Sequence, residues 1–587
     1  MHILGINAYH PDSSACIIKD GQLIAAVEEE RFRRIKHWAG LPEEAIKYCL
    51  KEANIELDNI DYIALNRNPR VNFYKKIIFV LLNRPSVHLV RNRLSNMLRV
   101  GVIKEDLKNK FIFSKSKINA KVYNIEHHRA HLASCFFVSP FEKAAVVSID
   151  GFGDFTSCMI ARGEDNKLDI LSEVNYPHSL GIFYTAFTQF LGFNKFGDEY
   201  KVMGLSAYGK PRYTKKMEDI LVLMPQGKFR LNLDYFSFYK ITNSMTWDNC
   251  EPKFDNLFSE ELKSIFGPAR QHQEELSDYH CDLAASLQET YERVFFHILN
   301  YAYKITGISK LCLAGGCALN SLANGKISDQ TPFKEIYIQP ASSDAGGSLG
   351  AAYYLYHQIL GKKRTFIMKD AYWGPGLYES ELKDELLARS KELESSKCIM
   401  KRIENKDELC SIAAQAISEG RIVGWFQGRM EWGARALGNR SILADPRSPQ
   451  IKDVLNARIK MREWFRPFAP SILSEKVGEY FEKDYPDPFM LKVYPVRRDK
   501  QALIPAVTHV DGTGRLQTVD REENPLFWQL IKEFEKITTI PVLLNTSFNE
   551  NEPIVCKPQE AIDCFLRTKM DLLIIGNVMI SKPEGLA

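Results

Sequence analysis

Two apolar strands, each running into a glycine pair and then a helix, constrain this fold most. Strand 310–314 leads into the turn 315–320, and strand 335–340 leads into the turn 342–348. Turns of this kind present backbone N–H groups and the positive end of a helix dipole to an anion. One Gly-Gly turn is weak evidence, but two such strand-turn-helix units predict an α/β fold that binds a nucleotide.

The amino-terminal stretch predicts a β-hairpin. Residues 3–7 and 15–27 have strand patterns, with a hairpin signal at Asp20-Gly21 and a small polar loop between them. Actin-like ATPase domains open in this way, and there the loop holds phosphate. With the two Gly-Gly units, the hairpin predicts a duplicated actin-like ATPase (ASKHA) domain. The charged run 28–37 is either a solvated edge or a segment that places its last two residues beside this loop.

Four side chains predict a metal site. His127 and His131 are four residues apart on a predicted helix, so their rings lie on one face and can share an ion. Asp150 and Asp344 each follow an apolar strand and could complete the ligand set. From ligand chemistry alone, Zn²⁺, Mn²⁺ and Fe²⁺ all fit. The alternative is a capped helix whose histidines bind nothing.

Length and composition fit a two-domain enzyme. A chain of 587 residues is too long for one core, and we place the boundary between residues 362 and 363, where apolar positions thin out. The twelve cysteines form no CxxC pair, which favours buried thiols in a reducing cytoplasm. We expect no signal peptide, and the apolar run 77–82 is too short to span a bilayer. The expectation is a cytoplasmic protein with no membrane partner.

Residues 67–121 form a basic segment without a clear strand pattern. Fourteen Lys and Arg residues stand against two acidic residues there. We expect a solvated helical insertion over the first domain. An RNA-binding arm is the alternative, but the segment lacks the interleaved aromatic residues of a base-stacking platform.

The second half of the chain carries many Arg and Lys residues near glycine turns. They gather in 427–443, in a predicted helix 452–463 and in 509–515. Arg can hold an oxyanion through two parallel hydrogen bonds, and Lys acts as a point charge. This pattern predicts a site for a small phosphate-bearing substrate, with a basic surface helix as the alternative.

Ordered motifs over nearly the whole chain resemble the NodU/CmcH carbamoyltransferase family. Two of them are Gly315-Gly-Cys-Ala-Leu-Asn320 and Phe465-Arg-Pro-Phe-Ala-Pro470. The least typical part is the basic segment 67–121. The motifs that carry the resemblance lie at 5–15, 28–37, 127–131, 201–205, 315–320, 344–352, 427–440, 465–470 and 544–549.

The resemblance implies a reaction. The domain 1–362 would be similar to the ATPase that makes threonylcarbamoyl-tRNA, and the domain 363–587 to the YrdC-type α/β domain of the same pathway. Such enzymes use carbamoyl phosphate and ATP, pass through carbamoyl-adenylate, and move the carbamoyl group to a hydroxyl group of a small acceptor. The His/Asp set would bind Fe²⁺ first, with Zn²⁺ or Mn²⁺ as alternatives, and Mg²⁺ could accompany ATP. Because carbamoyl-adenylate is labile in water, the two domains would have to be packed together.

Residue roles follow from this reaction. An acceptor alcohol needs a base, for which His10 and Asp12 are both candidates, and Lys36 would neutralise charge on the carbamoyl oxygen. Carbamoyl phosphate would be clamped by Lys460 and Arg515, with Arg435, Arg440, Asn545 and Ser547 as further contacts. The nucleotide would be held by Gly151, Gly153, Gly315, Gly316, Asn320, Gly346 and Gly347.

Three other functions fit parts of the pattern. A small-molecule kinase on the actin-like fold would release ADP, whereas transfer through an adenylate releases AMP and pyrophosphate. A tRNA-modifying enzyme would use 67–121 as an RNA arm and bind tRNA with a steep salt dependence. A non-catalytic assembly protein would not need the intact His/Asp set. We expect a small-molecule acceptor, no nucleic acid, and a homodimer on base rates alone; the sequence does not identify the acceptor.

Overall fold

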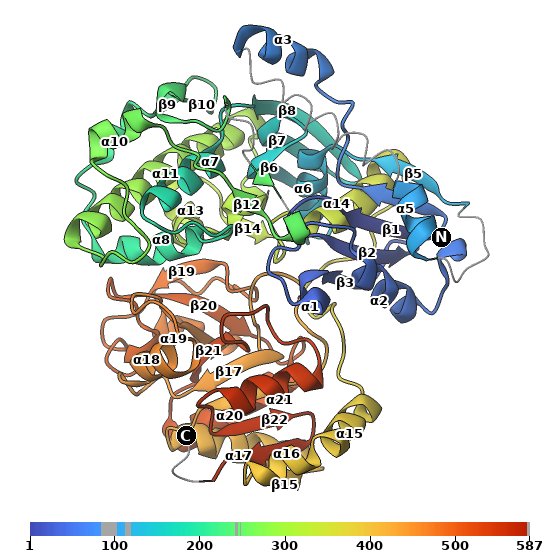
Figure 1. Ribbon diagram of the computed structural model, residues 1–587, viewed down its shortest axis with the longest axis vertical. Coiled ribbons are helices and arrows are strands. Elements are labelled where there is room, and N and C mark those ends of the chain that lie inside the picture. Colours follow the sequence, from blue (N-terminus) through green and yellow to red (C-terminus); the bar gives the residue numbers. More distant parts are fainter. Residues whose placement is uncertain (84–102, 112–118, 241–244, 247, 584–587) are drawn as a thin grey trace. The chain divides into compact units, whose positions relative to one another are not determined.

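A computed structural model describes the chain at residues 1–83, 103–111, 119–240, 245–246 and 248–583. It divides into two compact units, Met1–Met368 and Lys369–Ala587 (Figure 1). The boundary placed from the sequence lies six residues earlier. Both units mix helices and strands, as predicted. Within the described residues, no helix is long and apolar enough to cross a membrane.

Unit 1 contains one sheet topology twice. In the first sheet, β1 pairs antiparallel with β2 and parallel with β4, in the order β3-β2-β1-β4-β5. In the second sheet, β6 pairs antiparallel with β7 and parallel with β13, in the order β8-β7-β6-β13-β14. The predicted duplication is therefore present. The strands are β1 (His2–Asn7), β2 (Ser14–Lys19), β3 (Gln22–Glu28), β4 (Tyr62–Leu65), β5 (Lys121–Asn124), β6 (Lys143–Gly153), β7 (Thr156–Glu164), β8 (Lys167–Asn175), β13 (Lys310–Ala314) and β14 (Glu335–Ile338).

Close packing of two helices positions the His/Asp residues. The carboxylate of Glu126 accepts the backbone N–H groups of His128 and Arg129 and so caps α6 (His127–Phe136). Against it packs α14 (Gly346–Tyr353), where a Cβ atom at Gly350 would lie 1.8 Å from the carbonyl oxygen of Ala130. Only glycine permits this approach. It brings the turn before α14 to the histidine face of α6.

The remaining helices of unit 1 cover the two sheets. Between β3 and α2, the charged run is partly buried, because Glu29 is fully enclosed and accepts the N–H groups of Glu44 and Ala45. A solvated edge is therefore wrong for this part of the run. The main helices are α1 (Glu30–Arg33), α2 (Glu43–Ala53), α3 (Phe73–Asn83), α5 (Ile103–Lys110), α7 (Leu180–Phe190), α8 (Glu199–Leu205), α9 (Thr214–Glu218), α10 (Glu260–Phe266), α11 (Asp278–Thr306), α12 (Ser321–Gly325) and α13 (Ile327–Gln330). Of the basic segment, 84–102 and 112–118 lie outside the described residues.

Unit 2 is built on one mixed sheet of nine strands. Its order is β15-β23-β22-β16-β17-β21-β18-β20-β19, and Trp425 on β16 is fully buried in its core. The strands are β15 (Ile399–Arg402), β16 (Val423–Phe426), β17 (Arg440–Ala444), β18 (Ala469–Leu473), β19 (Lys492–Pro495), β20 (Thr513–Val519), β21 (Val542–Ser547), β22 (Leu572–Ile575) and β23 (Val578–Ser581). The helices are α15 (Glu379–Ala388), α16 (Ser390–Ser395), α17 (Lys406–Ser418), α18 (Ile451–Val454), α19 (Val477–Tyr480), α20 (Pro525–Thr538) and α21 (Pro558–Arg567).

The helix predicted over 452–463 is shorter than expected. It consists of α18 and a π-helical turn, Leu455–Ile459, and ends there. The next residue, Lys460, turns its side chain into the protein, where it bonds to residues after β21. This long-range contact, which the local pattern does not contain, ends the helix early.

Candidate functional site

Four ligand atoms converge in unit 1. They belong to His127, His131, Asp150 and Asp344, and all lie within 4.8 Å of one another. Nε2 of His127 is 3.1 Å from Nε2 of His131 and 3.3 Å from Oδ2 of Asp150. Oδ1 of Asp344 is 3.4 Å from the first nitrogen and 3.3 Å from the second. All four side chains are buried.

These separations match the shell of one metal ion. Four N and O ligands at roughly 2.0 to 2.2 Å from a tetrahedral ion lie roughly 3.3 to 3.6 Å apart. Five of the six separations run from 3.1 Å, between the two histidines, to 3.9 Å, between His131 Nε2 and Asp150 Oδ2, and the sixth is below 4.8 Å. The sequence-predicted set is thus a buried group able to hold a divalent metal.

The carboxylates of this group are ionised at neutral pH. Burial raises the pKa of Asp150, as does Asp344, but His127 and His131 outweigh both and bring it to about 2. Burial also acts against ionisation of Asp344, yet His10 and His127 hold its pKa well below the usual value. Ionised carboxylates are the form that binds a metal.

The two candidate bases in the first loop of unit 1, His10 and Asp12, have different partners. Nδ1 of His10 contacts Oδ2 of Asp344, so His10 lies beside the metal-capable group without being one of its four ligands. Oδ1 of Asp12 instead lies 2.7 Å from Nδ1 of His37, whose backbone N–H donates to Glu30 at 2.7 Å. Although burial lowers the pKa of His37, the Asp12 carboxylate outweighs it and raises the pKa to about 9. The side chain of Lys36 is exposed.

The residues predicted to hold a nucleotide fall into two groups. A Cβ atom would meet a protein atom at 1.9 to 2.2 Å at each of Gly153, Gly315, Gly346 and Gly347, so packing already requires these glycines. Asn320 accepts the N–H of Ala323 and caps α12. In contrast, nothing lies within 4 Å of a Cβ position at Gly151, and at Gly316 only the carboxylate of Asp150 does. Room for a ligand therefore remains at Gly151 and Gly316, both beside the His/Asp group.

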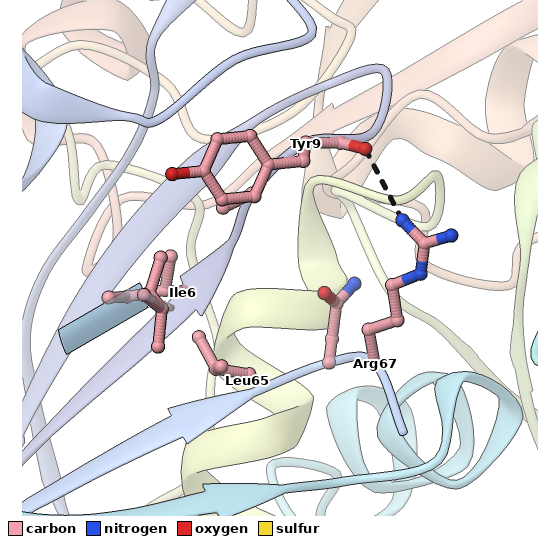
Figure 2. A pocket seen from close by; sticks show the side chains of 7 residues that line it. Ile6, Tyr9, Leu65 and Arg67 are labelled. Carbon is pink, nitrogen blue, oxygen red and sulfur yellow. Dashed lines mark hydrogen bonds between the residues drawn. The ribbon is translucent and has the colours of Figure 1, made fainter. Parts of the chain in front are cut away.

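A pocket lies at the carboxyl ends of β1 and β4 (Figure 2). Arg67 donates to the carbonyl oxygen of Tyr9 across its rim, at 3.4 Å. Its cavity volume is about 10 Å³, which is no more than the space that a single water molecule needs, so it is not a small-molecule site. None of the predicted site residues lines it. Its lining residues are Ile6, Ala8, Tyr9, Leu65, Asn66, Arg67 and Ile103.

In unit 2, Lys460 is buried among neutral acceptors. Its ammonium group donates to the carbonyl and side-chain oxygens of Asn549, at 2.7 and 2.8 Å, and to Ser547. Burial, followed by the nearby Arg462, lowers the pKa of Lys460 well below its usual value. The structure therefore brings two predicted residues, Lys460 and Ser547, into contact.

Arg515 lies at the centre of a group of positive charges. Its Nε atom is buried and makes no hydrogen bond within the described residues. Burial is the main cause that lowers its pKa, followed by three further arginines, while Asp487 acts the other way. The neighbours are Arg435, which was predicted, and Arg462 and Arg466, which were not. The sequence feature that could have identified them is that two arginines follow Lys460 within six residues.

Two other predicted residues support the scaffold. The guanidinium of Arg440 is fully buried, stacks 3.6 Å from the ring of Phe426, and donates to backbone carbonyls that include that of Pro375 at 3.0 Å. The amide of Asn545 donates to Ser471 and Gln517, both at 3.0 Å. The guanidinium of Arg440 and the amide nitrogen of Asn545 are therefore already bonded to the protein, whereas Oδ1 of Asn545 is buried and makes no hydrogen bond within the described residues.

The two family models that match this chain, one over each unit, describe the same kind of protein. Family models described as carbamoyltransferase N-terminus and carbamoyltransferase C-terminus match residues 2–353 and 414–582. An uncharacterized protein of Synechocystis sp. is 40% identical, covering 99% of this chain and 97% of its own length. Nodulation protein NolNO of Sinorhizobium fredii is 40% identical, covering 98% and 80%. Among solved structures, HypF of T. kodakarensis superposes with a TM-score of 0.32 at 14% identity, covering 61% of this chain and 48% of that one.

Proposed function

The chain belongs to the carbamoyltransferase family, and from this premise we propose an ATP-dependent O-carbamoyltransferase that acts through carbamoyl-adenylate. Unit 2 would form the adenylate, and unit 1 would move the carbamoyl group to a hydroxyl group of a small molecule. A kinase and a tRNA-modifying enzyme are not favoured, because both family models describe carbamoyl transfer.

The arginine group around Arg515 carries the proposal for unit 2. A buried guanidinium surrounded by further arginines is costly unless an anion neutralises it. Carbamoyl phosphate is a small dianion with phosphate oxygens that guanidinium groups bind bidentately. We place it between Arg515, Arg435, Arg462 and Arg466, with Lys460 and Ser547 at its edge. Arg440 and Asn545 would shape this site without touching the substrate. A YrdC-like fold for unit 2 stays a prediction.

The reaction in unit 2 would have two steps. Water displaces phosphate from carbamoyl phosphate and leaves carbamate. An oxygen of carbamate then attacks the α-phosphorus of ATP, which forms carbamoyl-adenylate and releases pyrophosphate. Both steps develop negative charge on oxygens that leave, and fixed arginines stabilise such charge without reorganisation.

The His/Asp group carries the proposal for unit 1. Its two imidazoles and two carboxylates fit a divalent ion, and we propose Fe²⁺, with Zn²⁺ and Mn²⁺ as the alternatives for this ligand set. A bound ion would supply Lewis-acid stabilisation to phosphate oxygens. The open positions at Gly151 and Gly316 would let the backbone approach the nucleotide beside that group.

We assign the general base to His10 rather than Asp12. The Asp12 carboxylate is already paired with the imidazole of His37, 2.7 Å away, and so is engaged within the protein. Nδ1 of His10 faces Asp344, so Nε2 is the nitrogen left to accept a proton from the acceptor hydroxyl. As this hydroxyl attacks the carbamoyl carbon, AMP leaves. Lys36 is placed by the resemblance only and would have to turn inward.

Nucleotide products test the whole proposal. Incubation with ATP and carbamoyl phosphate labelled in the carbamoyl carbon should yield AMP and pyrophosphate only when both substrates are present. A panel of sugars and other polyols then identifies the acceptor by label transfer. His10→Ala should still release pyrophosphate in amounts near one per enzyme and accumulate carbamoyl-adenylate, but it should lose label transfer to the acceptor. ADP as the sole nucleotide product would exclude the adenylate route.

A further inference from the structure

The hairpin of β6 and β7 holds the metal ligand His127 by three of its residues. Oδ2 of Asp150 lies 3.3 Å from Nε2 of the His127 ring, and a Cβ atom at Gly153 would lie 1.9 Å from Cγ of that ring. Oδ2 of Asp154 accepts the backbone N–H group of His127 at 3.0 Å. Asp150 is itself a ligand and Gly153 leaves room for the ring, whereas Asp154 has no role in the proposed reaction.

The tip of this hairpin has a backbone conformation that needs support from outside. Asp154 and Phe155 are consecutive non-glycine residues with positive φ, of 49° and 80°. The pairing of β6 with β7 is also irregular between Ile149 and Gly153. A non-glycine residue in such a conformation costs on the order of 1 to 3 kcal/mol and persists only where its surroundings over-determine it. The groups that fix Asp154 come from the start of the basic segment.

Residues 68–79, which we call the strap, pack on the tip of this hairpin. The backbone N–H group of Asn68 donates to Oδ2 of Asp154 at 2.6 Å. The side-chain amide of Asn72 donates to the carbonyl oxygen of Asp154 at 3.2 Å. Oδ2 of Asp154 therefore receives one N–H group from the strap and one from His127, the first residue of α6.

Aromatic and ionic contacts hold the strap in place. Phe79 lies edge-on to Phe155, with ring centroids 5.9 Å apart, and edge-on to Tyr176, with ring centroids 4.8 Å apart. Lys75 forms an ion pair with Glu173 on β8. An aromatic pair of this geometry contributes roughly 0.5 to 1.5 kcal/mol beyond the burial of its area. The two pairs together are comparable with the cost of one residue with positive φ, so the docked strap stabilises the strained tip.

We propose that Asp154 is a positioning residue for the His/Asp metal centre, and that the docked strap holds it against the backbone of His127. This inference rests on the proposed function, because it treats His127 as a metal ligand. Helix capping does not account for Asp154, since Glu126 already caps α6. Partners that orient a metal ligand typically change metal affinity by roughly 10 to 100-fold, which sets the size of the expected effect.

Binding of Co²⁺ to the metal-free, full-length protein tests this role. The ion accepts the same N and O ligands as Zn²⁺, and its visible absorption follows the geometry of those ligands. Asp154→Ala should weaken Co²⁺ binding at least tenfold and alter the absorption of the bound ion, because His127 is no longer fixed. Asp154→Asn keeps an acceptor oxygen and should restore the affinity to within about threefold of the wild type.

Asp165→Ala is the matched control. Asp165 is exposed, lies in the next hairpin at the other end of β7, and also has a positive φ, of 52°. Alanine is strained at a positive φ, so this variant should lose thermal stability as Asp154→Ala does, yet bind Co²⁺ like the wild type. Asn72→Ala removes one contact between the strap and the tip without a change of backbone strain, and it should weaken Co²⁺ binding by about threefold.

The possible results separate this role from the metal centre itself. Wild-type Co²⁺ affinity in Asp154→Ala would overturn the positioning role, and so would equal weakening by Asp165→Ala. If Asp154→Ala does not fold, an unchanged affinity in Asn72→Ala would overturn it instead. A wild type that binds no Co²⁺ would contradict the metal centre on which the proposed function of unit 1 depends, and this role with it. The first equivalent of pyrophosphate per enzyme, which unit 2 is proposed to release, should form in every variant.

Discussion

Oδ1 of Asp12 lies 2.7 Å from Nδ1 of His37, and this ion pair holds the first loop of unit 1 in place. Both residues have left-handed backbone conformations, with φ of 57° and 56°. Non-glycine residues keep such angles only where their surroundings over-determine them. The ion pair requires a protonated His37, so the conformation of the loop depends on the protonation of that side chain.

The first prediction is a loss of stability at alkaline pH. Because the pKa of His37 rises from 6.5 to about 9 on folding, its contribution is complete below pH 6.5 and disappears as pH rises through 9. The full shift corresponds to about 3 kcal/mol, and solvent reduces this because the His37 side chain is 30% exposed. Urea unfolding from pH 6 to 9.5 measures it. His37→Gln and Asp12→Asn should both flatten the profile; an unchanged slope would contradict the ion pair.

The second prediction uses neighbouring glycines. A Cβ atom at Gly153 would lie 1.9 Å from Cγ of His127, whereas none at Gly151 would touch the protein. Gly153→Ala should therefore displace the His127 ring and weaken metal binding by at least tenfold. Gly151→Ala should keep the metal and weaken nucleotide binding. Titration of each variant with Fe²⁺, Zn²⁺ and Mn²⁺, followed by an ATP analogue, separates the effects; equal metal affinities would show that Gly153 does not position His127.

The third prediction concerns metal removal. His131→Ala takes away a buried ligand and should lower metal content to background and carbamoyl transfer by at least a hundredfold. Dialysis against a chelator should lower the melting temperature of the wild type, because a ligand at a hundred times its Kd contributes about 2.7 kcal/mol. His272→Ala, at an exposed histidine, is the control and should match the wild type. A variant that retains stoichiometric metal would place the ion elsewhere.

The fourth prediction contrasts two buried arginines of unit 2. Arg515→Met should abolish AMP formation that depends on carbamoyl phosphate, without loss of stability, since it removes a charge with no carboxylate partner in hydrogen-bonding contact among the described residues. Arg440→Met should instead cost about 3 kcal/mol of unfolding free energy, because it leaves several buried carbonyl groups unpaired. Calorimetry and pyrophosphate release measure the pair. Equal destabilisation by both would argue against an anion site at Arg515.

The sequence did not predict a side chain's partner where that partner lies far along the chain. Arg440 was predicted to bind carbamoyl phosphate, but it donates hydrogen bonds to carbonyl groups such as that of Pro375, 65 residues away. The helix expected to reach 463 ends at Ile459 because Lys460 is drawn to Asn549. Arg462 and Arg466 were overlooked because composition shows that arginines are numerous, not which of them converge.

The sequence by itself determined that unit 1 is duplicated, the helix that bears His127 and His131, and the turns that carry Asp150 and Asp344. These features depend on strand and helix periodicity and on where an element ends, which are local properties of the backbone. Only the tertiary structure decided that Arg515 lies near three other arginines and that His10 and Asp12 have different partners. Such arrangements depend on contacts between residues far apart in the chain, such as His10 with Asp344, and no local pattern encodes which distant groups will meet.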